Sequence, residues 1–450
     1  MRFTRRVRDM DFAKVLILAL PSSLAVAAGC SSSNDAPLPP PAPPELVDAA
    51  AEGGAVDDDA GASPPTRDAG FVDVDPLPIE CTAPPCARAL VTTFSSAAVT
   101  TGGQGFCALL DDGTVACWGD NSAGQLGRGE PAGTLSGSSV PRRVAGLGRV
   151  VDLEHTCAVD EDGATWCWGT SRFLQDADVW KRTTQRIPVR IPVPPADTVA
   201  ISLDLGCVGT RDGRILCWGG GSSGQVGALS EDERGPTEIP MPPGPRVRKI
   251  AVGYSSFFTR EDGTTLSVGL SQTLGRVSSH HLDPTPAPIA VERVQSLDVA
   301  MSNVCAAARG RGYCWGSQLP RSLDNYSRSY PSGLVIPEPI VDIATTPTVS
   351  FDDGVTVPYR WCAVAASGAV YCWGYNESGQ AGTGTKEYVN DAARVAGLPA
   401  PAVSVKITRS TSCALLTTGK VHCWGSNYDG QLGNGRNRGV ALVPEEVLLP

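Results

Sequence analysis

The feature that most constrains the fold is the tripeptide Cys-Trp-Gly, which recurs six times at nearly regular spacing. Its copies occupy residues 117–119, 167–169, 217–219, 314–316, 372–374 and 423–425, and a degenerate Ser267-Val268-Gly269 fills the one gap. Successive central residues are 50, 50, 50, 47, 58 and 51 positions apart. A unit of this length accommodates four short strands and three turns. Seven such units predict a β-propeller with one blade per repeat.

Each unit has the same internal order of segments. An apolar run such as 150–153 precedes a strand with Cys-Ala, a tight turn, and the strand that ends in Cys-Trp-Gly. A Gly-Gln-x-Gly motif follows at 124–127, 224–227, 379–382 and 430–433, and a Pro-x-x-Val outer strand such as 141–144 closes the unit. The second, fourth and fifth units lack Gly-Gln-x-Gly, so we expect irregular outer loops there.

Composition agrees with many short strands. The 450 residues include 50 Gly and 37 Pro, which disfavours a helical bundle. The net charge of −10 argues against a basic nucleic-acid-binding surface. That charge lies in residues 31–80, where eleven acidic groups face only Arg67, whereas the 370 residues after position 80 sum to −3. The acidity therefore says little about a binding surface on the folded part.

These motifs together resemble the RCC1 (regulator of chromosome condensation) repeat family over roughly residues 90–450. The resemblance implies an all-β, seven-bladed propeller with four-stranded antiparallel blades. It also implies two known activities of family members, nucleotide exchange on a small GTPase and inhibition of hydrolases. The first does not suit an exported chain without a recognisable exchange motif, and the second is a variant of a binding function.

The cysteines form pairs at fixed spacing. Counting across the loop Asp111–Gly113 places Cys107 opposite Cys117, and the shorter Arg309-Gly310 turn of the fifth unit compensates for its shorter spacing. The fourth unit loses both cysteines together. We therefore predict disulfides, with reduced buried thiols or zinc sites as the alternatives, and the short segment before the repeats adds a seventh pair. The predicted pairs are Cys107 with Cys117, Cys157 with Cys167, Cys207 with Cys217, Cys305 with Cys314, Cys362 with Cys372, Cys413 with Cys423, and Cys81 with Cys86.

The N-terminus has the pattern of an export signal. Basic residues from Arg2 to Arg8 precede an apolar stretch too short and interrupted to span a membrane. Ala27-Ala28-Gly29-Cys30 resembles a bacterial lipobox, although Ala27 replaces the usual Leu. We expect residues 1–29 to be a lipoprotein signal peptide and Cys30 to carry the lipid. Ser31 after the cysteine suggests the outer membrane by resemblance to enterobacterial sorting; a plain signal peptide is the alternative.

Residues 30–80 are expected to be an extended tether, because they are rich in Pro and Asp and nearly lack aromatic residues. The propeller is expected to occupy residues 81–450. We expect its ring to close through a blade shared between the C-terminal strand 442–449 and residues 91–99.

A search for catalytic chemistry gives little. Gly220–Gly224 matches Gly-x-Ser-x-Gly, but it aligns with a repeat loop and lacks the context of a nucleophile elbow. His280, His281 and Asp283 fall in an irregular connection, where a solvated loop is a better interpretation than a metal site. No phosphate-binding loop or dinucleotide fingerprint is present, so no cofactor and no metal are predicted. The repeat tryptophans are interpreted as core residues between blades, with a ligand platform as the alternative.

The departures from the repeat are the best candidates for partner binding. The stretches 170–195 and 317–331 both follow a Cys-Trp-Gly strand, so both should emerge on one face, and both mix arginine with aromatic residues. Inert irregular loops are the alternative. The candidate residues are Arg172, Phe173, Trp180, Arg182, Tyr326 and Tyr330.

The sequence therefore predicts a monomeric, lipid-anchored, noncatalytic propeller at the bacterial envelope that binds a protein or glycan through one face. It touches the membrane only through its anchor and binds no nucleic acid. The alternative is a hydrolase or lyase acting on cell wall or polysaccharide. Acidic residues clustered at a central pocket would favour this alternative.

Overall fold

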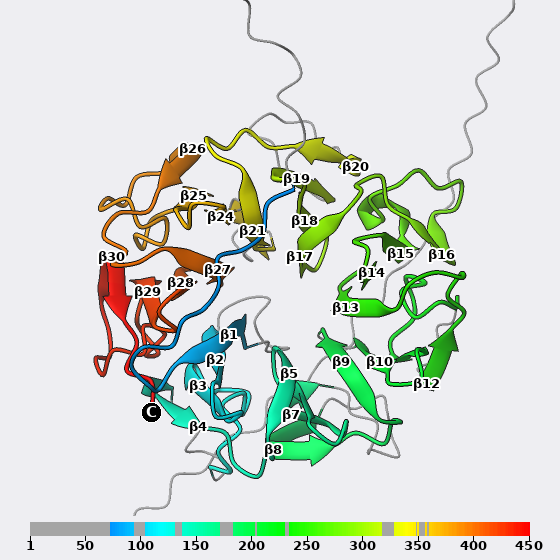
Figure 1. Ribbon diagram of the computed structural model, residues 1–450, viewed down its shortest axis with the longest axis horizontal. Coiled ribbons are helices and arrows are strands. Elements are labelled where there is room, and N and C mark those ends of the chain that lie inside the picture. Colours follow the sequence, from blue (N-terminus) through cyan, green and yellow to red (C-terminus); the bar gives the residue numbers. More distant parts are fainter. Residues whose placement is uncertain are drawn as a thin grey trace, which may run out of the picture. The chain divides into compact units, whose positions relative to one another are not determined.

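Each of the seven repeats folds into one four-stranded antiparallel sheet in the computed structural model, which describes residues 73–93, 104–130, 137–171, 183–202, 205–229, 234–316, 328–347, 349–350, 356–357 and 360–450. The chain divides into units Met1–Arg67 and Asp68–Pro450, and every described residue belongs to the second. In that unit the sheets surround a central channel, with the first strand of each blade innermost (Figure 1). The predicted seven-bladed propeller is confirmed.

The strands follow the predicted order within every blade. Blades one to three are β1 (Ala87–Thr92), β2 (Gly105–Leu110), β3 (Val115–Gly119), β4 (Ser138–Arg143); β5 (Val150–Glu154), β6 (Cys157–Asp160), β7 (Thr165–Ser171), β8 (Thr183–Arg190); and β9 (Ala196–Ile201), β10 (Leu205–Thr210), β11 (Ile215–Gly219), β12 (Arg234–Ile239). Blades four and five are β13 (Val247–Val252), β14 (Ser255–Arg260), β15 (Thr265–Leu270), β16 (Leu282–Pro288), with the 3₁₀ turn η1 (Ser271–Thr273); and β17 (Val294–Ala300), β18 (Asn303–Ala308), β19 (Arg311–Gly316), β20 (Arg328–Gly333).

Blades six and seven complete the ring. They are β21 (Ile340–Thr345), β24 (Arg360–Ala365), β25 (Val370–Gly374), β26 (Val389–Arg394); and β27 (Ala402–Ile407), β28 (Thr411–Leu416), β29 (Val421–Ser426), β30 (Val440–Glu446). A small hairpin, β22 (Val349–Ser350) with β23 (Thr356–Val357), is inserted between β21 and β24.

Disulfides link the two middle strands of six blades. The register places each cysteine directly opposite its partner, and the two-residue turn of blade five keeps its pair in register as well. The paired Cα atoms are 4.0–4.1 Å apart, close to the separation at non-hydrogen-bonded antiparallel positions. The six blade bonds join Cys107 with Cys117, Cys157 with Cys167, Cys207 with Cys217, Cys305 with Cys314, Cys362 with Cys372, and Cys413 with Cys423. Cys81 and Cys86 form the seventh bond, so all seven predicted pairs are confirmed.

Blade four replaces its missing disulfide with other contacts. Phe257 packs edge-on against Trp315 of the next blade, with ring centroids 6.0 Å apart. Ser267 instead faces Arg276, whose Nε donates to the Ser267 Oγ at 3.2 Å and whose Nη1 donates to the Asp283 carboxylate at 2.9 Å. A polar bridge thus joins the two outer strands of the blade that lacks the covalent link.

The repeat tryptophans fill the seams between blades. Four of them are fully buried, and each indole Nε1 donates to a backbone carbonyl of the preceding blade. The donor and acceptor pairs are Trp118 with Gln431 (2.9 Å), Trp168 with Gln125 (2.8 Å), Trp315 with Thr273 (2.8 Å) and Trp424 with Gln380 (2.9 Å). The interpretation of these tryptophans as core residues is confirmed for these seams.

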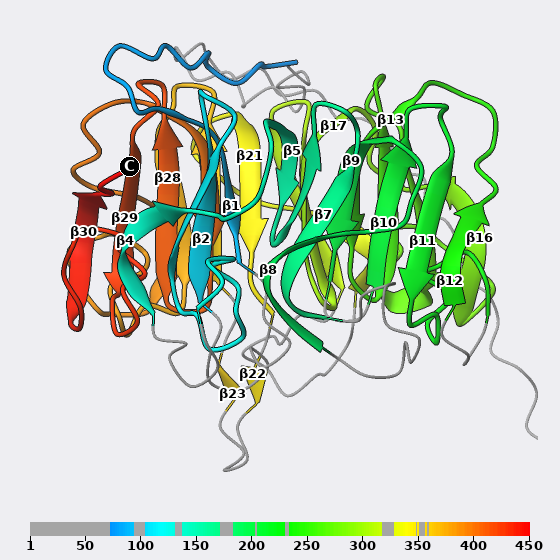
Figure 2. The same cartoon turned by 90° about the horizontal axis from the view of Figure 1, so that it is seen from below.

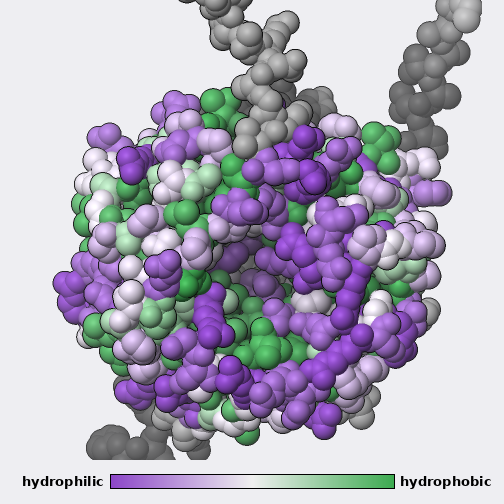
Figure 3. All heavy atoms as spheres, viewed as in Figure 1, coloured by the Kyte–Doolittle hydropathy of each residue, from purple (hydrophilic) through white to green (hydrophobic). Residues whose placement is uncertain are grey.

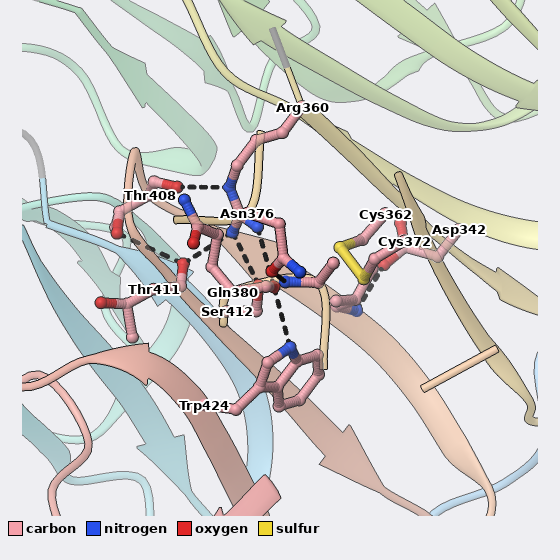
Figure 4. The surroundings of a disulfide bond; sticks show 12 residues. Asp342, Arg360, Cys362, Cys372, Asn376, Gln380, Thr408, Thr411, Ser412 and Trp424 are labelled. Atoms are coloured by element: carbon pink, nitrogen blue, oxygen red, sulfur yellow. Dashed lines mark hydrogen bonds between the residues drawn. A yellow bond between two sulfur atoms is a disulfide. The ribbon is translucent and has the colours of Figure 1, made fainter. Parts of the chain in front are cut away.

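The Gly-Gln-x-Gly motif builds the acceptor side of each such seam. In blade six the Gln380 side chain accepts from the Ser378 amide at 2.8 Å, which fixes the loop, and its carbonyl meets Trp424 (Figure 4). The last glycine, Gly382, has φ +69° and lies so close that a Cβ there would be 2.8 Å from the indole Nε1. Glycine is therefore required by both conformation and space.

The fourth unit corrects one expectation. Its loop is not irregular, because Thr273-Leu274-Gly275 takes the place of Gln-x-Gly: Thr273 supplies the carbonyl, Leu274 is fully buried and Gly275 has φ +71°. The loops of the second and fifth units fall at 172–182 and 317–327, outside the described residues.

A buried arginine adds to the seam between blades six and seven. Arg360 is 1% exposed, and its guanidinium donates to the carbonyls of Gln380, Thr408 and Thr411 at 2.9–3.0 Å and to the Ser412 Oγ at 2.6 Å (Figure 4). Burial lowers the pKa of Arg360 to about 9, so the side chain stays charged at neutral pH. Its positive charge is balanced by the negative ends of carbonyl dipoles.

The prediction that the two ends of the propeller share one blade is wrong. β30 pairs with β29 and β1 pairs with β2, so each blade comes from one continuous segment. Blades seven and one instead meet through side chains and loops. Gln104 Oε1 accepts from the Ser410 amide at 3.0 Å, and the Ala87 amide donates to the Gly419 carbonyl at 2.8 Å. Repeat spacing alone does not decide where a unit begins, and this seam is closed without a shared strand.

A segment before β1, residues 73–86, lies along the ring and is called the strap here. Asp73 pairs with Arg293 of blade five, and the Glu80 amide donates to the Thr417 carbonyl of blade seven at 2.7 Å. Val74, Leu77 and Ile79 pack on the cores of blades six, seven and one. Residues 73–80, which we expected to be part of the tether, therefore lie on the propeller, because apolar side chains among them pack on the blade cores.

Candidate functional site

The ring of residues 73–450 has two distinct faces. The turn face carries the tight turns between the second and third strands of the blades, and the strap runs along it. The loop face carries the ends of the Cys-Trp-Gly strands and the β22–β23 hairpin. Figure 2 shows the strap in blue above and this hairpin below, on opposite faces.

Of the sequence-predicted partner-binding residues, the structure describes Tyr330, which lies on the outer strand β20 and is 55% exposed. The strands that lead into the two candidate stretches end at Ser171 and Gly316, both at the loop face. Their shared face therefore stays a prediction that the flanking strands support. The candidates Arg172, Phe173, Trp180, Arg182 and Tyr326, and the predicted lipidation site Cys30, lie outside the described residues.

The central channel forms a cavity of about 570 Å³, which sequence reasoning did not locate. Seen from the turn face, the centre of the ring is hollowed; hydrophilic residues border much of the hollow, and hydrophobic residues lie along its lower side (Figure 3). Pro76, Leu77 and Ile79 of the strap line one side of its mouth. The inner strands contribute charged residues to its wall: Arg88, Asp152, Glu154, Arg248, Lys249, Asp342 and Lys406.

Three aspartates on inner strands satisfy backbone groups of the next blade. Each inner strand is an edge strand, so some of its amides have no ladder partner. Val199, Thr345 and Val405 each donate from their amide, at 2.8–3.0 Å, to a carboxylate of the preceding blade. The acceptors are Asp152, Asp298 and Asp342, respectively. The carboxylates thus join neighbouring blades along the channel.

Burial and neighbouring charges shift the pKa values of the charged groups in the channel. Burial raises the pKa of Asp152 to about 6, and a neighbouring charge, Glu154, acts in the same direction. Burial alone would lower the pKa of Lys406, but Asp342, Asp298 and Glu154 raise it above its usual value. Acidic residues do cluster at a central pocket, and this is the feature that we expected to favour an enzyme. Because two carboxylates of this cluster, those of Asp152 and Asp342, accept backbone amides of the next blade, the cluster is better explained by joining of blades than by catalysis.

Other residues considered in the search for catalytic or metal-binding chemistry have structural roles. Asp283 accepts from Arg276 and, at 2.8 Å, from the Ser278 hydroxyl, so it is committed within its own loop. Gly220–Gly224 forms the turn after β11, as the repeat alignment predicts. Among the described residues, no group of three or more His, Cys, Asp or Glu side chains is placed to hold a metal ion. Within the same part of the chain, no helix is long and apolar enough to cross a membrane.

Comparison with known families identifies the repeats. Two models described as Regulator of chromosome condensation (RCC1) repeat match residues 97–125 and 402–431, and residues 112–158, 212–258 and 418–450. Protein pim1 of Schizosaccharomyces pombe is 23% identical over 77% of this chain and 62% of its own length. The mitochondrial RCC1 domain-containing protein RUG3 of Arabidopsis thaliana is 29% identical over 38% of this chain and 40% of its own length. The chain thus spans less than two thirds of these curated relatives.

Solved structures agree on the fold. Prp20p from Saccharomyces cerevisiae matches with a TM-score of 0.58 at 19% identity, covering 74% of this chain and 85% of that one. Human WBSCR16 matches with a TM-score of 0.58 at 17% identity, covering 75% and 94%. At these identities the likeness concerns architecture.

Proposed function

Because the chain carries RCC1 repeats arranged as a seven-bladed propeller, we propose that it is a noncatalytic binding module that holds a protein or glycan partner against its loop face. We further propose that this module lies at the bacterial envelope, on a lipid anchor at Cys30. The lipobox-like Ala27–Cys30 and a fold with seven disulfides, which persist in oxidising compartments, both support that location.

One observation carries the choice of face. Of the twelve large apolar side chains exposed among the described residues, seven lie in loops at the loop face or in the half of an outer strand nearest to it. Exposed aromatic side chains are typical anchors of binding surfaces. Tyr330, predicted from the sequence, is one of the seven. The set comprises Leu229, Tyr254, Val277, Tyr330, Tyr388, Tyr428 and Val440.

The turn face is less suited to a partner, because the strap already runs along it from blade five to blade one. A relative offers a parallel for a protein ligand, since the study of Prp20p describes its binding to Gsp1p and histones. For this chain a protein partner is part of the proposal. An inhibited hydrolase would be one such partner.

Capture from detergent-solubilised envelope tests the proposal with two matched triple variants of the full chain. The loop-face variant is Leu229→Ser, Tyr254→Ser and Tyr428→Ser, and the turn-face control is Val151→Ser, Val335→Ser and Leu448→Ser; all six side chains are 41–95% exposed. We expect the wild type and the control to retain the same partner and the loop-face variant to lose it. Loss in the control alone, or equal retention by all three proteins, would contradict the proposed face.

A further inference from the structure

The strap is fastened at the seam where the ring closes. Cys86 lies between the tight turns of blades one and seven: its carbonyl accepts from the Asp111 amide at 2.9 Å, and a Cβ at Gly419 would be 2.6 Å from its own Cβ. Cys81 is bonded to Cys86 and extends the attachment to the apolar part of the strap. Among the described strands none is shared between the first and last blades, and these contacts join the two blades on the turn face.

This disulfide differs from the other six in accessibility. The twelve cysteines within the blades are all 0–2% exposed, and Cys86 is 1% exposed, whereas Cys81 is exposed on the surface of the strap. Thiol–disulfide exchange begins with attack of a thiolate on an accessible sulfur. A dissolved reductant can therefore reach one of the seven bonds without opening a blade.

The strap also bounds the central cavity. Pro76, Leu77 and Ile79 line the cavity mouth, and the apolar residues beneath them, Leu90, Val403 and Leu415, belong to the same cavity wall or to the core of blades seven and one. Movement of the strap would widen the mouth and uncover this apolar surface. At its far end the strap is held by the exposed ion pair of Asp73 with Arg293, a kind that contributes little to stability, and by a hydrogen bond that the Gln295 Nε2 donates to the Val74 carbonyl.

From these three observations we propose that the Cys81–Cys86 disulfide is a redox latch: its reduction by a dithiol releases residues 73–86 and opens the turn-face mouth of the channel. The dithiol's thiolate attacks the Cys81 Sγ, forms a mixed disulfide and expels the Cys86 thiolate. The second thiol of the reductant then displaces Cys81, so the dithiol becomes a disulfide and two protein thiols form. Two electrons and two protons pass to the protein.

The test combines thiol mapping with amide hydrogen exchange on the full chain. Protein is titrated with dithiothreitol, alkylated and digested, so that each cysteine is assigned to its peptide. We expect Cys81 and Cys86 to be alkylated before any blade cysteine. In the same samples, exchange at the amides of Glu80, Ala87 and Asp111 should rise about fortyfold, the factor lost with closure of a six-residue loop. Exchange in the buried strands β2 and β28 should not change.

A double variant, Cys81→Ser with Cys86→Ser, provides the second arm and should show the faster exchange without reductant. Alkylation of blade cysteines together with Cys81 would overturn the proposal, because the bond would not be selectively reducible. Selective reduction with unchanged exchange at the three amides would also overturn it, since the strap would then be held without the bond. Faster exchange throughout all blades on mild reduction would show unfolding in place of a latch.

Discussion

The packing of glycine against tryptophan in the seams can be tested with one methyl group. In Gly382→Ala, the new Cβ would lie 2.8 Å from the Trp424 Nε1 and 2.9 Å from the Val395 Cγ1, at φ +69°. An L-residue in this left-handed conformation costs about 1–2 kcal/mol. Forcing a methyl group into the filled seam adds about 1–3 kcal/mol. We therefore expect Gly382→Ala to destabilise the protein by about 2–5 kcal/mol.

Gly384 is the matched control, because it has φ +84° and a Cβ there would meet nothing within 4 Å. Gly384→Ala should show only the conformational cost of about 1–2 kcal/mol. Urea midpoints with m-values measure both losses, and amide exchange at the seam locates them. If the two variants lose equal stability, the seam does not depend on close contact between glycine and indole, and our account of the Gly-Gln-x-Gly motif is refuted.

Three further predictions concern single blades. The double variant Cys207→Ala with Cys217→Ala should lose about 3 kcal/mol, the loop-closure contribution of an eleven-residue loop, with faster amide exchange in blade three; unchanged stability would contradict this. Arg276→Met leaves the Asp283 carboxylate without its cation and should cost about 3 kcal/mol in urea unfolding, whereas a neutral result would show that blade four does not need its polar bridge. Asp152→Asn tests how the protonation of Asp152 couples the stability of the protein to pH. Because the folded pKa of Asp152 is raised from 3.8 to about 6, the wild type loses stability as the pH rises from about 4 to about 6. The free energy of unfolding of the variant minus that of the wild type should increase by about 2–3 kcal/mol across this window, and a flat difference would contradict the raised pKa.

Contacts within a repeat could be predicted from the sequence. Cys107 and Cys117 are ten residues apart across a tight turn, so turn length alone fixes which residue faces which. The same counting works for Cys305 and Cys314, where one residue fewer in the turn matches one fewer in the spacing. Local hairpin geometry therefore determines the cross-strand partners.

Contacts between repeats could not be predicted in the same way. The indole of Trp118 meets the carbonyl of Gln431, 313 residues later, and this partner depends on where the ring closes. Thr273 supplies a carbonyl and no specific side chain, so its role leaves only a weak signal in the retained Leu274-Gly275. Arg360 and the channel aspartates bind backbone groups of the next blade, which any residue type can provide.

The candidate site was predictable only in part. Tyr330 was found because aromatic residues interrupt a repeat, whereas Tyr254 and Tyr428 lie in regular repeat loops and are recognised only by their exposure in the fold. Exposure depends on the arrangement of neighbouring blades, which the periodic pattern does not encode.

Binding at the loop face is tested most directly by an amide-exchange footprint of the full chain with and without its captured partner. We predict protection at the loop-face residues around Leu229, Tyr254 and Tyr428, with the strap and the channel strands β5 and β21 unchanged. Protection confined to the strap or the channel would contradict a loop-face binding module.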